Sequence, residues 1–442
     1  MIEGKFSVRS KRDWWFGLLL PLPLFVQMNG PLGLYAEPEE LPVGIGVPIG
    51  FLLAAAFLLP DLPKLRHRLA LGPIAKIALL VFGLWTLFLG FLGAQENKLA
   101  LLYAGQWLAP LAAAVYASVV AFEEERLFSL LAGLKRGTAL ALGFLVSLFL
   151  CELLSSGSFG GRITQNAFLP GMYQLYNYVP VSLTLSALFC AGLEASSAKT
   201  LRSIKVWVFL FGAAMVPLIT GARDPALIYM LVAPLPAWWA WRTRGVLALI
   251  AGSGILVCFF LILADGNLLL LHKLQGTFSS YGETTLSGMF GPRAEVMESY
   301  WSLAKEHPWT GLRLLPPTIA DPQAGVVAKS AHNTYLDILA GGGPIALLSF
   351  LVLLLSALWA TPKLVFRSLH RQGSASAERE SLRAAAQSAA APVVGLVLIS
   401  CNLRTPLREP ISAWVGFLLI GFLLSWAYFE KRASSSSSRM TG

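Results

Sequence analysis

The chain has 442 residues, of which 56% are hydrophobic and only 13% are charged, and its mean hydropathy is +0.65. Soluble domains carry about 25% charged residues, so this composition excludes an ordinary soluble globular protein and indicates an integral membrane protein. The net charge is +10 at pH 7. Its distribution along the chain favours anionic lipid headgroups, and not nucleic acid, as the partner.

Apolar runs of about 20 residues, the length that crosses a bilayer as an α-helix, recur along the chain. We predict an all-α integral membrane protein with about 12 transmembrane helices. The eleventh run is short, and the seventh and eighth almost adjoin. The predicted spans are residues 14–30, 41–60, 73–94, 99–121, 137–156, 176–195, 205–221, 225–241, 245–265, 335–359, 391–403 and 411–429.

Lysine and arginine are divided unequally between alternate connections. The side that holds the N-terminus has 24 of the 34 basic residues, and the other side has ten, five of them in one long connection. Because basic residues concentrate in cytoplasmic loops, both termini are predicted to be cytoplasmic, with the positive charge facing membrane lipids. Residues 431–442, which contain a run of serines, are predicted to form a disordered cytoplasmic tail.

The longest external connection runs over residues 265–333 and separates spans 1–9 (residues 1–264) from spans 10–12 (residues 334–430). A loop of this length inside a compact bundle is usually functional. Within it, "RAEVMESYWSLAKEH" (residues 293–307) places Val296, Tyr300, Trp301 and Leu303 at helical spacing. The pattern predicts an amphipathic helix on the membrane surface or over a cavity, or a lid that only packs on the bundle.

Motifs for nucleotide or zinc chemistry are missing from the sequence: it has no Walker A, HExxH or GxSxG motif, and no GxGxxG in a strand–helix context. The external carboxylates form no cluster suited to a divalent metal. The four cysteines, Cys151, Cys190, Cys258 and Cys401, lie in apolar runs, where buried and unreactive thiols are expected. The sequence therefore predicts neither a metal nor a cofactor.

Arginines on the predicted external side are the first candidates for chemistry. At a membrane boundary an arginine costs a few kcal/mol unless it is paired or reaches the headgroups, which makes it a functional candidate. Guanidinium donors match phosphate oxygens, so several arginines converging on one cavity would suit a phosphate or diphosphate. Asp224 offers a structural pairing with Arg223 as the alternative. The external arginines considered are Arg162, Arg223, Arg293, Arg404 and Arg408.

His332 is the second kind of candidate. It lies in "SAHNTYLDILAGGGP", directly before the tenth span, where Asn333 or Thr334 is able to cap the helix. Asp337 falls in the early turns, where negative charge is favourable. An imidazole near neutral pH is suited to general-base catalysis. From the residues alone, a loop histidine that happens to precede a helix is the alternative interpretation.

The order of these motifs resembles that of the O-antigen ligase and polymerase superfamily. The family pattern has a histidine and Asn, Ser or Gln, then nine residues and G-x-x-G; here His332 and Asn333 are followed at that spacing by Gly343, with Ala346 at the second glycine. "GARDPALIYM" is similar to the segment carrying one family arginine (Arg223), although Asp224 replaces the usual glycine. "GPRAEVMESYWSLAKEHPWTGL" is similar to the segment carrying another (Arg293), followed by P-x-x-G.

The resemblance implies a metal-independent, inverting glycosyltransferase of the GT-C type in the bacterial inner membrane, with its active site facing the periplasm. The donor would be a polysaccharide on undecaprenyl diphosphate, and the acceptor a sugar hydroxyl of lipid A–core. His332 would act as base, and Arg223, Arg293 and Arg162 would hold the diphosphate. Supporting positions would be Asn333, Asp224, Arg404, Arg408, Tyr300 and Trp301, the two aromatics contacting sugar or lipid or anchoring the membrane surface.

Other activities remain open at this point. A polymerase of the same superfamily usually has two sizeable external loops, and the single dominant loop favours the ligase. A protein O-oligosaccharyltransferase tends to have a further C-terminal domain, whereas only about a dozen residues follow the twelfth predicted span. A flippase for lipid-linked glycans would bind diphosphate without breaking a bond. Transporters often show repeated halves, and no convincing internal repeat is present.

Overall fold

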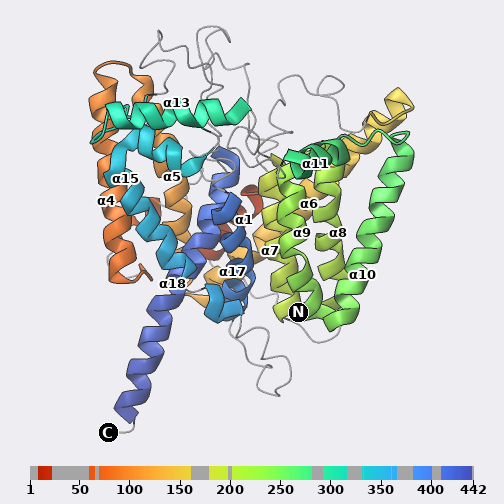
Figure 1. Ribbon diagram of the computed structural model, residues 1–442. Coiled ribbons are helices and arrows are strands. Elements are labelled where there is room, and N and C mark those ends of the chain that lie inside the picture. Colours follow the sequence, from red (N-terminus) through yellow and green to blue (C-terminus); the bar gives the residue numbers. More distant parts are fainter. Residues whose placement is uncertain are drawn as a thin grey trace.

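The computed structural model describes residues 8–21, 59–64, 69–160, 179–197, 202–280, 292–315, 331, 333–359, 361–365, 382–400 and 410–440. Every regular element within these ranges is a helix, and the long helices lie side by side in a bundle (Figure 1). The elements are α1 (Val8–Leu19), the 3-10 helix η2 (Leu59–Lys64), α4 (Pro73–Ala94), α5 (Leu99–Val120), α6 (Glu124–Ser156), α7 (Val179–Ser197), α8 (Arg202–Thr220), α9 (Arg223–Val232), α10 (Pro234–Leu263), α11 (Leu269–Ser280), α13 (Pro292–Glu306), α15 (Thr334–Leu358), α17 (Leu382–Ser400) and α18 (Pro410–Met440).

Several helices extend beyond the apolar runs that predicted them. α4 coincides with the predicted span 73–94, but α6 begins 13 residues before position 137 and α17 begins nine residues before position 391. Hydropathy marks the apolar part of a helix, whereas charged residues such as Glu, Lys and Arg continue the helix because they are good helix formers. The predicted span 41–60 lies almost entirely outside the described residues.

Four helical stretches in the described chain are long and apolar enough to cross a membrane: α4, α6, α10 and Thr334–Val365. Three shorter apolar stretches accompany them, Pro180–Ser196, Ile204–Thr220 and Ala413–Trp426. An all-helical chain of this kind is consistent with a membrane protein. The number of twelve spans stays a prediction.

The predicted spans 225–241 and 245–265 are two limbs joined by a tight turn. Within α10 the backbone leaves helical geometry at Trp241 (φ −137°, ψ 18°) and Arg242 (φ 57°, ψ −142°). The limbs pack closely after the turn, because a Cβ on Gly245 would lie 2.1 Å from the carbonyl oxygen of Ala237. The basic connection predicted between these spans is therefore only a few residues long.

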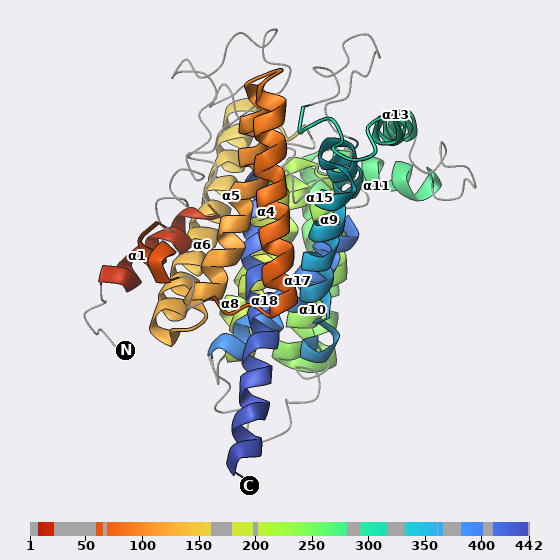
Figure 2. The same ribbon diagram turned by 90° about the vertical axis from the view of Figure 1, so that its left-hand side faces the viewer.

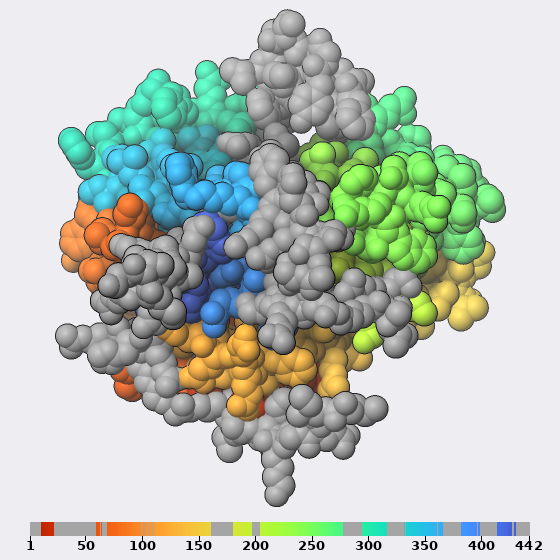
Figure 3. Space-filling view, turned by 90° about the horizontal axis from the view of Figure 1, so that it is seen from below, coloured from red at the N-terminus to blue at the C-terminus, as the bar shows by residue number. Residues whose placement is uncertain are grey.

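Small residues allow the helices to approach closely, as they do in many membrane proteins. α7 lies at the centre and packs on α6, α8, α10, α17 and α18. At the contact of α18 with α5, a Cβ on Gly421 would lie 2.3 Å from the carbonyl oxygen of Ala114. In the view from below, residues of the C-terminal helices (blue) lie between the orange side formed by α4 and the green side formed by α10 (Figure 3).

The short helix α1 is joined to α6 through glycines. A Cβ on Gly133 would lie 2.0 Å from the carbonyl oxygen of Trp14, and one on Gly17 would lie 2.1 Å from that of Leu130. These contacts bring two backbones together with no side chain between them. α1 begins at Val8, six residues before the predicted span 14–30, so the helix includes Arg12 and Asp13, which lie toward α6.

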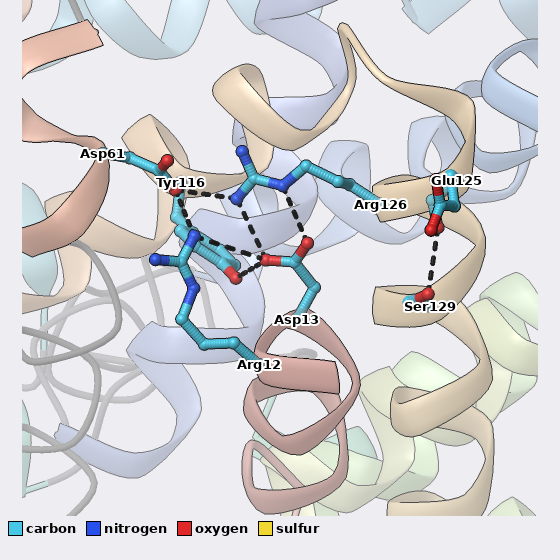
Figure 4. Close-up of polar contacts among 7 residues, drawn as sticks. All are labelled: Arg12, Asp13, Asp61, Tyr116, Glu125, Arg126 and Ser129. Atoms are coloured by element: carbon cyan, nitrogen blue, oxygen red, sulfur yellow. Dashed lines mark hydrogen bonds and ion pairs between the residues drawn. The ribbon is translucent and has the colours of Figure 1, made fainter. Parts of the chain in front are cut away.

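Those charged residues form a buried cluster between α1, η2, α5 and α6 (Figure 4). Arg126 donates from Nε to Asp13 and from Nη2 to Asp61, both at 2.7 Å, and Arg12 reaches Asp61 at 2.5 Å. Tyr116 donates to Asp13. Burial alone would raise the pKa of Asp61, but the hydrogen bonds and charges of Arg126 and Arg12 outweigh it and hold that pKa below its ordinary value. Two guanidinium and two carboxylate groups neutralise one another here and tie α1 to the bundle.

The last helix extends beyond the rest of the bundle (Figures 1 and 2). α18 continues to Met440, so residues 431–440 are helical where the sequence predicted a disordered tail. Extending an existing helix needs no new nucleation, so the free-energy cost of adding each further residue is small even in a serine run.

Candidate active site

The site is built around a break in α15. The backbone of Gly343 is left-handed (φ 73°, ψ −176°), and the next residue, Pro344, has no N–H to donate. The carbonyl groups before the break therefore need partners from elsewhere. Ala340 accepts from the backbone N–H of Leu312 at 2.7 Å, and Gly341 accepts from that of Leu314 at 2.8 Å.

A third carbonyl at the break is satisfied by α4. The indole Nε1–H of Trp85 donates to the carbonyl oxygen of Gly342 at 2.8 Å. The segment after α13 also touches the end of α4, where a Cβ on Gly93 would lie 2.4 Å from the carbonyl oxygen of Arg313, and Arg313 pairs with Glu96. The broken helix is thus held between the segment 309–315 and α4.

The glycines of the two late motifs meet backbone to backbone. Gly311 of "PWTG" is left-handed (φ 57°), and a Cβ there would lie 2.5 Å from the carbonyl oxygen of Ala340. A Cβ on Gly343 would lie 2.2 Å from the carbonyl oxygen of Trp309. Both positions therefore need glycine for conformation and for space. The contact joins the motif that follows Arg293 to the motif that follows His332.

Ala346, at the second glycine of the family pattern, is accommodated by its neighbour. Ala346 is buried, and its Cβ lies 2.7 Å from the position a Cβ on Gly342 would take. Gly342 leaves the room that Ala346 fills, which explains physically how the helix keeps its close packing with alanine at this position.

Side chains of α15 hold the chain on both sides of position 332. Asn333 is the N-cap, and its Oδ1 accepts the N–H of Leu336 at 3.0 Å. Asp337 is buried, and its Oδ1 accepts the N–H of Ala331 at 2.8 Å. His332 itself lies outside the described residues.

α13 lies across the start of α15 (Figure 1). It spans Pro292–Glu306, in agreement with the predicted amphipathic helix. Tyr300 and Leu303 are buried, and Tyr300 forms a small apolar cluster with Ala331 and Ala340. Trp301 points away, half exposed, with the Lys305 ammonium 5.5 Å from its ring centre.

Arg293 is the second residue of α13, and its side chain lies outside the described part of the chain. The packing of α13 on α15 nevertheless places the helix that carries Arg293 against the segment that carries Asn333. Among the predicted supporting residues, Tyr300 lies in this interface, whereas Trp301 is on the outer face of the helix.

Arg223 begins α9, two residues after the left-handed Gly221 (φ 63°). Its Nε lies 3.4 Å from Oδ1 of Asp224, so the structural pairing left open by the sequence is present, although it is long for a hydrogen bond. Lys273 of α11 donates to the carbonyl oxygen of Gly221 at 2.9 Å. A second cation therefore lies beside the start of α9.

The three predicted motifs lie toward the same end of the bundle. α11 and α13 are both at the upper end in two perpendicular views, and Lys273 marks that end as the one where α9 begins (Figures 1 and 2). Arg162, Arg404 and Arg408 lie outside the described residues.

Residues 207–351 match the O-antigen ligase family. No curated protein matches the chain. The matched stretch contains Arg223, Arg293, His332 and Gly343, in the order on which the resemblance rests. The match supports the ligase and polymerase superfamily and, in general terms, an activity of that type on lipid-linked glycans. Together with the apolar helices it indicates a membrane-embedded protein.

In the described part of the chain, no three His, Cys, Asp or Glu side chains are close enough to hold a metal ion. Metal independence stays a prediction. Cys190 is buried, as expected, but Cys151 and Cys258 are exposed because they lie on helix faces that the bundle does not cover. Cys401 is outside the described residues.

Sequence reasoning missed three contributors to this region: Trp85, Lys273 and the anchoring role of Asp337. Trp85 is one of 13 tryptophans and lies in an ordinary apolar span. Lys273 follows an apolar run with no motif around it. From the sequence, Asp337 is recognisable only as an acidic residue in an early helical turn, since its bond to Ala331 depends on how the incoming chain folds back.

Proposed function

We propose that the protein is an O-antigen ligase. It transfers a polysaccharide from undecaprenyl diphosphate to a sugar hydroxyl of lipid A–core, without a metal, and inverts the anomeric centre. The proposal is supported by the family match, which covers the Arg223, Arg293 and His332 motifs in order. The observation that carries it is the backbone contact of Gly311 with α15 at the Gly343 break, because it brings the last two motifs together.

The transfer needs one base and one group of cations. The acceptor hydroxyl oxygen forms a bond to the anomeric carbon while the bond from that carbon to the diphosphate oxygen breaks. The electron pair of the broken bond leaves with the diphosphate, and the hydroxyl proton passes to the imidazole of His332. Arg223 and Arg293, with Arg162, neutralise the charge that develops on the leaving diphosphate.

The surroundings of position 332 support this role. Asn333, directly after His332, accepts a hydrogen bond from the N–H of Leu336, and Asp337 accepts one from the N–H of Ala331, directly before His332. Tyr300 packs beside Ala331. A base must be kept in a narrow range of positions relative to the reacting atoms. Of the remaining candidates, Asp224 is assigned to its pair with Arg223, and Arg404, Arg408 and Trp301 to supporting contacts with the donor or the membrane surface.

The proposed setting is the bacterial inner membrane, with both termini cytoplasmic and α13 in the periplasm. Two exposed positions test it, Trp309 after α13 and Glu125 at the start of α6. After the native cysteines are replaced, a membrane-impermeant thiol reagent should label Trp309→Cys in intact spheroplasts and Glu125→Cys only after permeabilisation. The opposite labelling pattern would reverse the orientation and contradict a periplasmic site.

The activity is tested with purified protein in liposomes and a glycan on undecaprenyl diphosphate. A ligase transfers the glycan to lipid A–core, with EDTA present and no nucleotide added. Growth of lipid-linked chains without lipid A–core would identify a polymerase, and transfer to a serine-containing protein would identify a protein-modifying enzyme. Movement of the donor across the bilayer without transfer would identify a flippase. Any of these three outcomes contradicts the ligase.

A further inference from the structure

The acidic side chain of Asp337 closes a small loop around position 332. It lies on the fourth residue of α15 and is 6% exposed. Its Oδ1 accepts the backbone N–H of Ala331, two residues before the N-cap, at 2.8 Å. An acidic residue in the first turn of a helix normally satisfies N–H groups of the helix itself. Here the carboxylate reaches back past the cap to the incoming chain.

The N-cap makes the complementary contact on the other side of the histidine. Asn333 accepts the N–H of Leu336, which fixes the residue directly after His332 to the first turn. Ala331 and Asn333 are covalently bonded to His332, and consecutive Cα atoms are about 3.8 Å apart across a trans peptide. Both residues bonded to His332 are therefore anchored to the first turn of α15.

A third contact, with Tyr300 of α13, also holds Ala331 in place. Ala331 is fully buried and packs with Tyr300 of α13 and Ala340 of α15. The methyl group of Ala331 meets α13 while its N–H meets Asp337. Ala331 is thus held between the helix that carries Arg293 and the helix that begins at Thr334.

We propose that Asp337 is a positioning residue for His332: by holding the N–H of Ala331, it keeps the imidazole where the acceptor hydroxyl is deprotonated. The inference rests on the proposed ligase function. The contact is from a side-chain oxygen to a backbone N–H, so an amide oxygen is able to replace the carboxylate oxygen. The role depends on an acceptor atom at this point, and the negative charge is secondary.

The substitutions follow from that distinction. Asp337→Asn keeps an acceptor of the same length, whereas Asp337→Ala removes it. Misplacing a catalytic group by about 1 Å costs on the order of 100-fold in rate. We therefore expect kcat to fall by about 100-fold in Asp337→Ala and to stay within about tenfold of the parent in Asp337→Asn. The Kd for the lipid-linked donor should be unchanged in both, because the arginines that bind the diphosphate are untouched.

The experiment measures kcat for transfer to lipid A–core and the Kd of lipid-linked donor, in the full-length protein in liposomes. The variants are Asp337→Ala, Asp337→Asn, His332→Ala and, as a control that removes an exposed acidic side chain from the first turn of α6, Glu125→Ala. Hydrogen exchange of the peptide containing Ala331 is followed in each variant. It should speed up in Asp337→Ala and stay at the parental rate in Asp337→Asn and Glu125→Ala.

The outcomes separate the inference from the function it rests on. Loss of kcat in Asp337→Ala with recovery in Asp337→Asn, unchanged donor Kd and faster exchange at Ala331 supports the positioning role. Transfer that depends on His332 but is unaffected by Asp337→Ala overturns the inference alone. Equal loss in Asp337→Asn and Asp337→Ala also overturns it, since the charge would then be what matters. Absence of transfer by the parent protein overturns the proposed function and the inference with it.

Discussion

The backbone N–H of Leu312 donates to the carbonyl oxygen of Ala340 at 2.7 Å. This carbonyl is available because Pro344, four residues later, has no N–H with which to continue the α-helix. The bond joins the segment after α13 to α15. The motif that contains Gly311 and the motif that contains Gly343, which are separated in the sequence, are therefore in direct contact.

Replacing Gly343 by alanine should disrupt the contact between α15 and the segment 309–315. Its backbone is left-handed, and the added Cβ would lie 2.2 Å from the carbonyl oxygen of Trp309. We expect a loss of at least about 1–3 kcal/mol in the free energy of unfolding, measured by thermal unfolding in detergent. Gly341→Ala is the matched control: its Cβ would meet nothing closer than Leu314 at 4.0 Å, so it should melt at or above the parental temperature. Equal melting of the two variants would contradict the account of the break.

The buried cluster at α1 gives a second stability prediction. Arg126→Ala leaves Asp13 and Asp61 buried with less compensating charge, which we expect to cost about 3–5 kcal/mol. Glu125→Ala, at the adjacent exposed position, should change stability by less than about 0.5 kcal/mol. Thermal unfolding in the same detergent compares them, and a parental melting temperature for Arg126→Ala would show that the cluster does not hold α1.

Much of this architecture follows from the sequence. Apolar runs predicted the helical bundle, and helical spacing predicted the helix at residues 293–307, because both signals are local. The break at Gly343 was not predicted as such, although the G-G-G-P run contains its cause: a left-handed glycine followed by a residue without an N–H. Its partners, Leu312, Leu314 and Trp85, are distant in the chain, and no local pattern identifies them.

The buried charges illustrate the same limit. In the sequence, Arg126 is one of the basic residues of a predicted cytoplasmic connection, where it would ordinarily be solvated. It is instead 2% exposed, because Asp13 and Asp61 are brought to it from two other segments. A sequence shows that charges exist, but pairing across about 65 and 113 positions depends on the packing of α1 on α6.

The arginine assignment predicts a loss of donor binding as well as of turnover. Arg223→Ala and Arg293→Ala should each reduce transfer by at least about 100-fold and weaken binding of the lipid-linked donor, whereas the lysine variants keep a fraction because charge without the forked geometry remains. Lys305→Ala removes a positive charge from the outer face of α13 and serves as the control for Arg293. Parental donor affinity in Arg223→Ala and Arg293→Ala would rule out a diphosphate site at these residues.

In the proposed reaction, His332 takes the proton from the acceptor hydroxyl. This step is tested most directly by single-turnover transfer from preloaded lipid-linked glycan to lipid A–core, comparing the parent protein with His332→Ala. A general base contributes about 100- to 10,000-fold, so the rate should fall within that range while donor binding is retained. Transfer by His332→Ala at the parental rate would contradict the account.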